Sequence, residues 1–125
     1  MGRYNNIFGD IMGYSWENLI ALTDEPDKFV KLLNSNKMTD IELSEAAEIG
    51  GFALSPKIIF DTLFKLLDHK SALVREGALY GLEDSEHITE PLLIKLKDMM
   101  LNDPSEGVRQ VATNFYEDIR GECQN

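Results

Sequence analysis

Cysteine and long apolar runs are scarce in this chain. Its one cysteine, Cys123, has no partner for an intramolecular disulfide, so we expect an inert thiol. The longest apolar run without glycine, Leu19 to Leu22, is far shorter than the roughly 20 residues that cross a bilayer. Residues 1–14 lack the apolar centre of a secretion signal. These absences predict a cytoplasmic protein without a membrane-spanning segment.

Basic side chains are also few. The chain has 12 Lys and Arg against 22 Asp and Glu, which gives a net charge of −10, and the acidic residues are spread evenly along it. Direct binding of nucleic acid is not expected, because phosphate recognition needs clustered Lys and Arg. The excess of acid indicates either simple solubility or attraction to a basic partner.

Groups that converge for catalysis are missing from the sequence. The two histidines, His69 and His87, stand apart, and no glycine-rich phosphate loop or nucleophile elbow is present. The loop 83–87 gathers three carboxylates and an imidazole and could hold a metal in principle, but it lacks the spacing of a calcium or zinc site. We expect no enzymatic activity, no cofactor and no metal site.

Proline punctuates what remains. Pro26, Pro56 and Pro91 each precede an apolar helical pattern, and proline is favoured in the first turn of a helix. The 125 residues contain no linker, so we expect one all-α domain, 1–125. Three helical hairpins are predicted at 26–53, 56–84 and 90–120, with second helices at about 39–53, 72–84 and 105–120. A capping helix at 15–23 and an irregular lead-in at 1–14 precede them.

The capping helix has a predicted buried stripe. Ser15 is a suitable N-cap, and Trp16, Leu19, Ile20 and Leu22 follow it at helical spacing. We expect this stripe to close one end of the helical stack.

Two segments of the chain repeat each other 34 residues apart, 67–78 and 101–112. Leu, Ser, Val, Arg and Ala fall in the same register, so Arg75 corresponds to Arg109. An offset of 31 residues extends the pattern to an earlier copy, in which Ser44 takes the arginine position. A period of this length, with two helices in it, is typical of an α-solenoid.

This pattern resembles the HEAT repeat family of armadillo-like helical repeat proteins: an apolar first helix, a turn with Asp, then Val-Arg followed three residues later by Ala. The match is clearest over 68–82 and 103–119 and weaker over 39–53. The resemblance implies an α-solenoid of about three HEAT-like hairpins. It also implies that the turn acids and the arginines are structural and pair within or between repeats; these residues are Arg75, Arg109, Asp68 and Asp103. Asp103 with Arg109 fits this pattern, and Asp68 with Arg75 fits it less cleanly because Asp68 aligns with Asn102.

Glycine is concentrated in the predicted second helices, at Gly50, Gly51, Gly77 and Gly81. Each costs about 1 kcal/mol in a helix interior relative to alanine. We expect close helix packing to compensate, and a groove floor that admits a partner's backbone is the alternative.

The second helices line the concave face of HEAT-like stacks. In the alignment, Glu45, Glu76 and Gln110 form one row, and Ile49, Tyr80 and Asn114 form the next. An acidic row beside an aromatic predicts a groove for a basic or amphipathic segment. The candidate partner-binding residues are Glu45, Glu48, Glu76, Tyr80, Glu83, Gln110, Asn114 and Glu117. In the alternative, Tyr80 and Ile49 are core and the acids only solvate a face.

Two functions fit this sequence. The first is a non-enzymatic adaptor or assembly scaffold that binds another protein through its acidic concave face. The second is a small acidic inhibitor or immunity-type protein that masks a basic nuclease or nucleic-acid-binding partner. Homo-oligomerisation through the C-terminal hairpin also stays open, because no repeat follows Phe115, Tyr116 and Ile119 to cover them.

Overall fold

The computed structural model describes residues 14–124, with side chains from 14 to 121, so the predicted lead-in before Tyr14 and the thiol of Cys123 lie outside the described parts. Within this range the chain is all-α, as predicted. The helices are α2 (Trp16–Leu22), α3 (Pro26–Leu33), α4 (Asp40–Ala53), α5 (Pro56–Leu66), α6 (Ala72–Ser85), α7 (Glu90–Asn102) and α8 (Glu106–Gln124). None of the helices in the described range is long and apolar enough to cross a membrane.

Local chemistry fixes most helix starts. Pro26 and Pro56 are the first residues of α3 and α5. Ser55 accepts a hydrogen bond from the Lys57 N–H at 3.3 Å, and Thr89 caps α7 in the same way. At α4, Thr39 forms a reciprocal capping box with the third helical residue. These starts agree with the predicted hairpins to within one residue.

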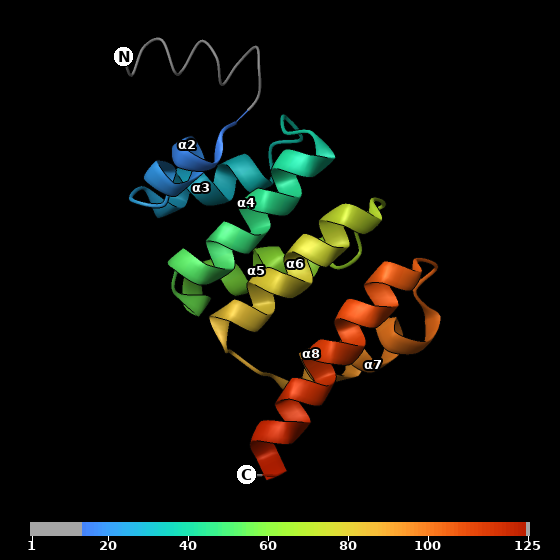
Figure 1. The fold of residues 1–125 in the computed structure, drawn as a ribbon. Coiled ribbons are helices and arrows are strands. Elements are labelled where there is room, and N and C mark those ends of the chain that lie inside the picture. Colours follow the sequence, from blue (N-terminus) through green and yellow to red (C-terminus); the bar gives the residue numbers. More distant parts are fainter. Residues whose placement is uncertain (1–13, 125) are drawn as a thin grey trace.

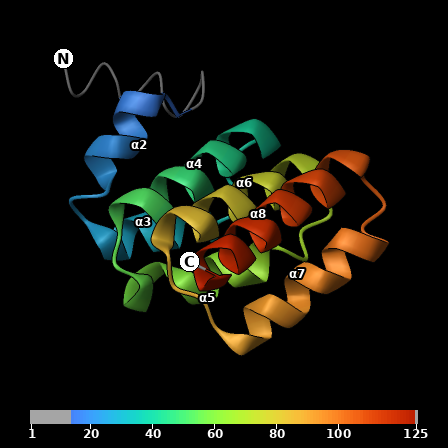
Figure 2. The same ribbon diagram turned by 60° about the horizontal axis from the view of Figure 1, so that its bottom comes forward.

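The helices form two layers. The second helix of each pair, α4, α6 and α8, lies beside the next (Figure 1), and α3, α5 and α7 lie on the other side of this row (Figure 2). Contacts join α4 to α6 and α6 to α8, and each of α3, α5 and α7 contacts the helix that follows it. Helix α2 packs against α3 and α4 at one end of the row.

The repeat in the sequence corresponds to a repeat in burial. Each second helix buries the same four positions, related by the offsets of 31 and 34 residues. They are Leu43, Ala46, Ala47 and Gly50 in α4, Val74, Gly77, Ala78 and Gly81 in α6, and Val108, Val111, Ala112 and Phe115 in α8. The sequence repeat therefore reflects equivalent buried positions in the three helices.

Helices α4 and α6 touch through their backbones. A Cβ atom built on Gly51 would lie 2.0 Å from the carbonyl oxygen of Gly81. One built on Gly77 would lie 2.4 Å from the carbonyl oxygen of Ser44, and one on Gly81 would lie 2.4 Å from that of Ala47. Real Cβ atoms essentially never come so close, so only glycine fits these positions. The predicted close packing is confirmed for this pair.

Helices α6 and α8 meet through side chains instead. The positions that carry Gly77 and Gly81 in α6 carry Val111 and Phe115 in α8, and Phe115 is 1% exposed. A Cβ on Gly107, near the start of α8, would lie 3.2 Å from a carboxylate oxygen of Glu76, which is the far end of a flexible side chain. Bulkier residues thus separate the third hairpin from the second.

A buried ion pair ties this second junction. Arg75 in α6 donates two hydrogen bonds to the Asp103 carboxylate, both at 2.9 Å. The same guanidinium reaches the backbone oxygens of His69 at 2.8 Å and Lys70 at 3.1 Å. Arg109 donates to the backbone oxygen of Asp103 at 2.6 Å. Each arginine therefore holds the turn before its own helix, and Arg75 alone of the two also binds the next hairpin's carboxylate.

Asp68 lies elsewhere in the network, where its carboxylate pairs with Lys95 of α7. The side chain of Asp68 is 71% exposed, so this pair contributes little. The carboxylate that Arg75 binds comes from the next hairpin.

Two expectations about apolar residues need correction. Of the predicted stripe on α2 only Leu19 is buried, whereas Trp16 is 48% and Ile20 is 47% exposed. Helix α2 has only about two turns and packs against α3 and α4 through the side that carries Leu19, so Trp16 and Ile20 stay partly exposed. Phe115, expected on an uncovered face, is buried because the side of α8 that carries it faces the rest of the protein.

Candidate binding groove

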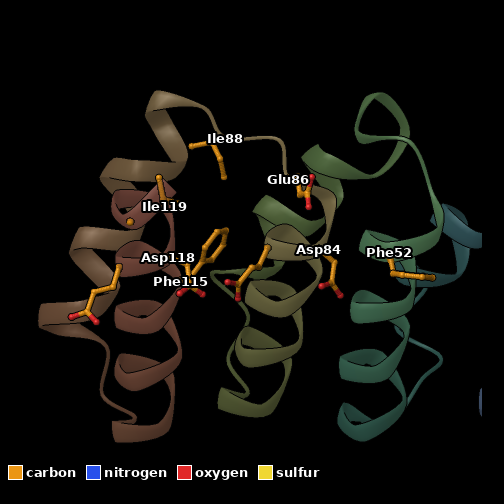
Figure 3. A pocket seen from close by; sticks show the side chains of 10 residues that line it. Phe52, Asp84, Glu86, Ile88, Phe115, Asp118 and Ile119 are labelled. Atoms are coloured by element: carbon orange, nitrogen blue, oxygen red, sulfur yellow. The ribbon is translucent and has the colours of Figure 1, made fainter. Parts of the chain in front are cut away.

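The larger cavity opens between the C-terminal halves of α6 and α8. It has a volume of about 810 Å³, and its lining extends across to Phe52 of α4 (Figure 3). Phe115 and Ile119 supply apolar wall from α8, and Ile88 supplies it from the loop after α6. The acidic lining residues are Glu83, Asp84, Glu86, Glu117 and Asp118. We call this the α6–α8 cavity; it lies where the bulk of Phe115 holds α8 away from α6.

A second cavity lies on the other side of Phe52. It has a volume of about 350 Å³, and five of its lining residues are apolar: Trp16, Ile20, Ile49, Phe52 and Ala53. Glu48 and Asp84 complete the lining. We call this the Trp16 cavity. Phe52 and Asp84 belong to both cavities, so the two are neighbours, and we call them together the acidic groove; residues of α2, α4, α6 and α8 line it.

The groove carries strong negative charge. Six carboxylates line it, and among the described residues neither cavity is lined by a lysine or an arginine. The groove also lies at the C-terminal ends of α4 and α6, where the helix dipole adds partial negative charge. Neither helix has a basic residue in its last turn to offset this field. A cation in the groove would be attracted by all of these groups.

The surroundings of two of these carboxylates, Glu48 and Asp84, raise their pKa. Partial burial raises the pKa of Glu48, and the negative charges of Asp84 and Glu45 raise it further. Partial burial also raises the pKa of Asp84. Removal from water without a nearby cation disfavours the charged form of both groups. A cation near these two carboxylates would favour their charged forms.

Large apolar side chains are exposed beside these acids. Phe52 is 81% exposed, and Trp16, Ile20 and Ile88 are each more than one-third exposed. Single exposed apolar residues are ordinary, but a contiguous set around a cavity is typical of an interaction site. The groove therefore offers apolar contact and negative charge together.

The predicted partner-binding residues divide into two groups. Glu48, Glu83 and Glu117 line the groove. The others do not line either cavity: Glu45, Glu76, Tyr80, Gln110 and Asn114 lie elsewhere on the second helices. Glu76 packs near Gly107, and Gln110 donates a hydrogen bond to Asn114 at 2.9 Å. Tyr80 is 44% exposed and Ile49 only 4%, so the core alternative holds for Ile49 alone.

Several groove residues were absent from the predicted set: Trp16, Ile20, Phe52, Asp84, Glu86, Ile88, Asp118 and Ile119. The acidic ones among them could have been found from the sequence, because acidic residues cluster at 83–86 and 117–118, in or just after the predicted second helices. The exposure of Trp16 and Phe52 has no such signal, since it depends on how α2 rests on α4.

His87 of the loop 83–87 packs against an aromatic ring and does not form a metal site with the carboxylates of that loop. The His87 ring packs edge-on against Phe60, with ring centroids 5.1 Å apart. Among the described side chains, no three His, Cys, Asp or Glu residues are grouped closely enough to hold a metal ion. His87 therefore serves as an aromatic contact between the loop and α5.

Comparisons of the chain with protein-family models, with curated proteins and with solved structures gave no match. The chemistry of the groove is the basis for assigning a function.

Proposed function

We propose that this chain is a short α-solenoid of HEAT-like hairpins that binds a basic, amphipathic segment of a partner protein in the acidic groove. The repeat assignment is supported by the equivalent buried positions of α4, α6 and α8 and by the matching bonds of Arg75 and Arg109 to the turns before their helices. The protein does no chemistry in this role, and it works as an adaptor or assembly module.

One observation carries the binding proposal. Six carboxylates line the groove among exposed apolar side chains, and the described lining includes no lysine or arginine. A partner helix with apolar and basic residues on one face would bury the first against Phe52 and Ile88 and place the second near the acids. Charge complementarity and apolar burial then act on the same segment.

The exposed apolar residues favour this role over the acidic inhibitor that masks a basic surface. Masking by charge needs only the carboxylates, and its affinity falls well over tenfold between low and high salt. Binding that also buries Phe52 and Trp16 retains more of its affinity at high salt, because hydrophobic burial is not screened. Salt dependence therefore separates the two functions.

The test uses a synthetic amphipathic helix of about five turns with leucine and arginine on one face. We expect the chain to bind this peptide and to bind a same-composition peptide with shuffled positions at least tenfold more weakly. Isothermal titration calorimetry measures both affinities. Equal affinities for the two peptides, or no binding, would contradict the proposal.

Protein variants locate the site. Phe52→Ser should weaken binding of the amphipathic peptide about tenfold, because it removes an apolar contact at the centre of the groove. Leu101→Ser is the matched control: Leu101 is 76% exposed, compared with 81% for Phe52, but it lies on α7 and lines neither cavity. Equal loss of affinity in both variants would show that binding does not depend on the groove.

A further inference from the structure

We propose that the Trp16 cavity is the anchor site for one arginine side chain of the bound segment. This inference rests on the proposed function and adds the residue type that the partner must supply. It is carried by the shape of the cavity, by its apolar walls and by the two carboxylates that enter it from adjacent helices.

The size of the cavity suits one side chain. Its volume of about 350 Å³ lies at the lower end of the range for small-ligand sites. A helix cannot enter such a space, but a long side chain that projects from a helix in the neighbouring α6–α8 cavity can. The two cavities share Phe52 and Asp84, so a segment seated in the larger one passes the mouth of the smaller one.

The walls suit the stem of a long cationic side chain. Ile20, Ile49 and Ala53 provide aliphatic surface, and Trp16 provides an indole ring. Lysine and arginine bury their methylene stems against such surfaces and keep the charged end near polar groups. A guanidinium also stacks on an indole face, which lysine does less well.

Among the described residues, no lysine or arginine lines the cavity beside its two carboxylates. Glu48 comes from α4 and Asp84 from α6, and the charges of Asp84 and Glu45 act against ionised Glu48. The helices that form the cavity, α2, α4 and α6, have no basic residue in their last turns. A guanidinium can donate to two carboxylates at once through its planar fork, and it loses less hydration than an ammonium on entering an apolar site. These properties favour arginine over lysine.

The test compares two peptides of equal charge, the leucine–arginine helix described above and its leucine–lysine counterpart. Trp16 is the chain's one tryptophan and lines the cavity, so its fluorescence reports directly on occupancy. We expect the arginine peptide to bind about five- to tenfold more tightly than the lysine peptide and to change Trp16 emission more strongly.

Variants of the cavity sharpen the result. Glu48→Gln and Asp84→Asn should each bring the arginine-to-lysine affinity ratio close to one. Glu117→Gln, which changes a carboxylate of the α6–α8 cavity alone, should weaken both peptides equally and leave the ratio unchanged. Since all three replacements keep the side-chain shape, each variant should fold, and circular dichroism checks this.

The outcomes separate the two proposals. If both peptides bind but the ratio persists in Glu48→Gln and Asp84→Asn, the arginine site is wrong and the groove stands. If neither peptide binds, the proposed function itself is wrong. A change in Trp16 emission on dilution without peptide would identify a second copy of the chain as the occupant and overturn the arginine site.

Discussion

The junction between α4 and α6 and the junction between α6 and α8 join the same kind of helix in different ways. At the first, glycines at positions 51, 77 and 81 let the two backbones touch. At the second, Val111 and Phe115 occupy the positions of Gly77 and Gly81, and Phe115 lines a cavity of about 810 Å³. The junction with glycine at these positions is thus the close one, and the junction with larger side chains is the open one.

The difference also divides stability from function. The close junction gains dispersion contacts where the backbones of α4 and α6 meet. The open junction relies on the buried Arg75–Asp103 pair at one end and exposes carboxylates and apolar walls at the other. The larger cavity of the candidate groove lies at the junction where larger side chains replace the glycines of the repeat.

The largest expected loss of stability comes from breaking the Arg75–Asp103 ion pair at the junction between α6 and α8. Arg75→Ala should lower the free energy of unfolding by about 3 to 4 kcal/mol, because it leaves the buried Asp103 carboxylate without its cation. Chemical denaturation measures the loss. Arg109→Ala removes the equivalent arginine of the next repeat, which is bonded to a backbone oxygen, and should cost about 1.5 kcal/mol. Equal costs for the two variants would show that the bond between hairpins adds nothing.

A smaller loss is expected from adding one methyl group to the close junction. Gly81→Ala should lower stability by about 2 to 3 kcal/mol, because its Cβ would lie 2.4 Å from the Ala47 carbonyl oxygen. This loss exceeds the gain of about 1 kcal/mol in helix propensity. Gly121→Ala in α8 is the matched control: among the described residues, no atom outside its chain neighbours and its own helix backbone lies within 4 Å of the added Cβ, so it should be stabilising by up to about 1 kcal/mol. Thermal melts of the pair compare the two sites, and stabilisation by both would contradict the backbone contact.

The smallest effect concerns pH and the groove carboxylates. The raised pKa of Glu48 means that its proton is bound more tightly in the folded state than in the unfolded chain. The contribution of Glu48 to stability is therefore greatest below the ordinary pKa of 4.5 and is lost as pH rises through the folded-state value. Glu48→Gln removes this penalty and should be stabilising by a few tenths of a kcal/mol at pH 7, because the carboxylate is only partly shielded. Melts at about pH 3.5 should show no such gain, since both side chains are then neutral. A gain of equal size at both pH values would point to packing instead of charge.

Features encoded by neighbouring residues could be predicted from the sequence. Helix starts at Pro26, Pro56 and Thr89 depend on bonds within one turn, and the structure has them where the sequence places them. The close packing of Gly77 and Gly81 was also predictable, because glycine in a helix needs a compensating contact. Three of the candidate groove residues, Glu48, Glu83 and Glu117, were identified from their place on the second helices.

The remaining features depend on contacts between distant segments. The Asp103 carboxylate pairs with Arg75, 28 residues earlier, whereas the family pattern pairs Asp103 with Arg109; only the backbone oxygen of Asp103 bonds to Arg109. Trp16 and Ile20 have the spacing of a buried stripe, yet the line of contact with α4 buries only Leu19. The choice among faces of a short helix is made by its neighbours, so the exposed half of the groove could not be predicted.

The Arg75–Asp103 bond lies near the N-terminal ends of α6 and α8, and the α6–α8 cavity lies near their C-terminal ends. From Val108 to Gly121, helix α8 extends for about 20 Å, so a rotation of about 5° at the Arg75–Asp103 bond moves its far end by about 1.7 Å. The first two hairpins are held together by the backbone contacts at Gly51, Gly77 and Gly81. A change in the angle between α6 and α8 at the Arg75–Asp103 bond would therefore widen or narrow the α6–α8 cavity without breaking that bond.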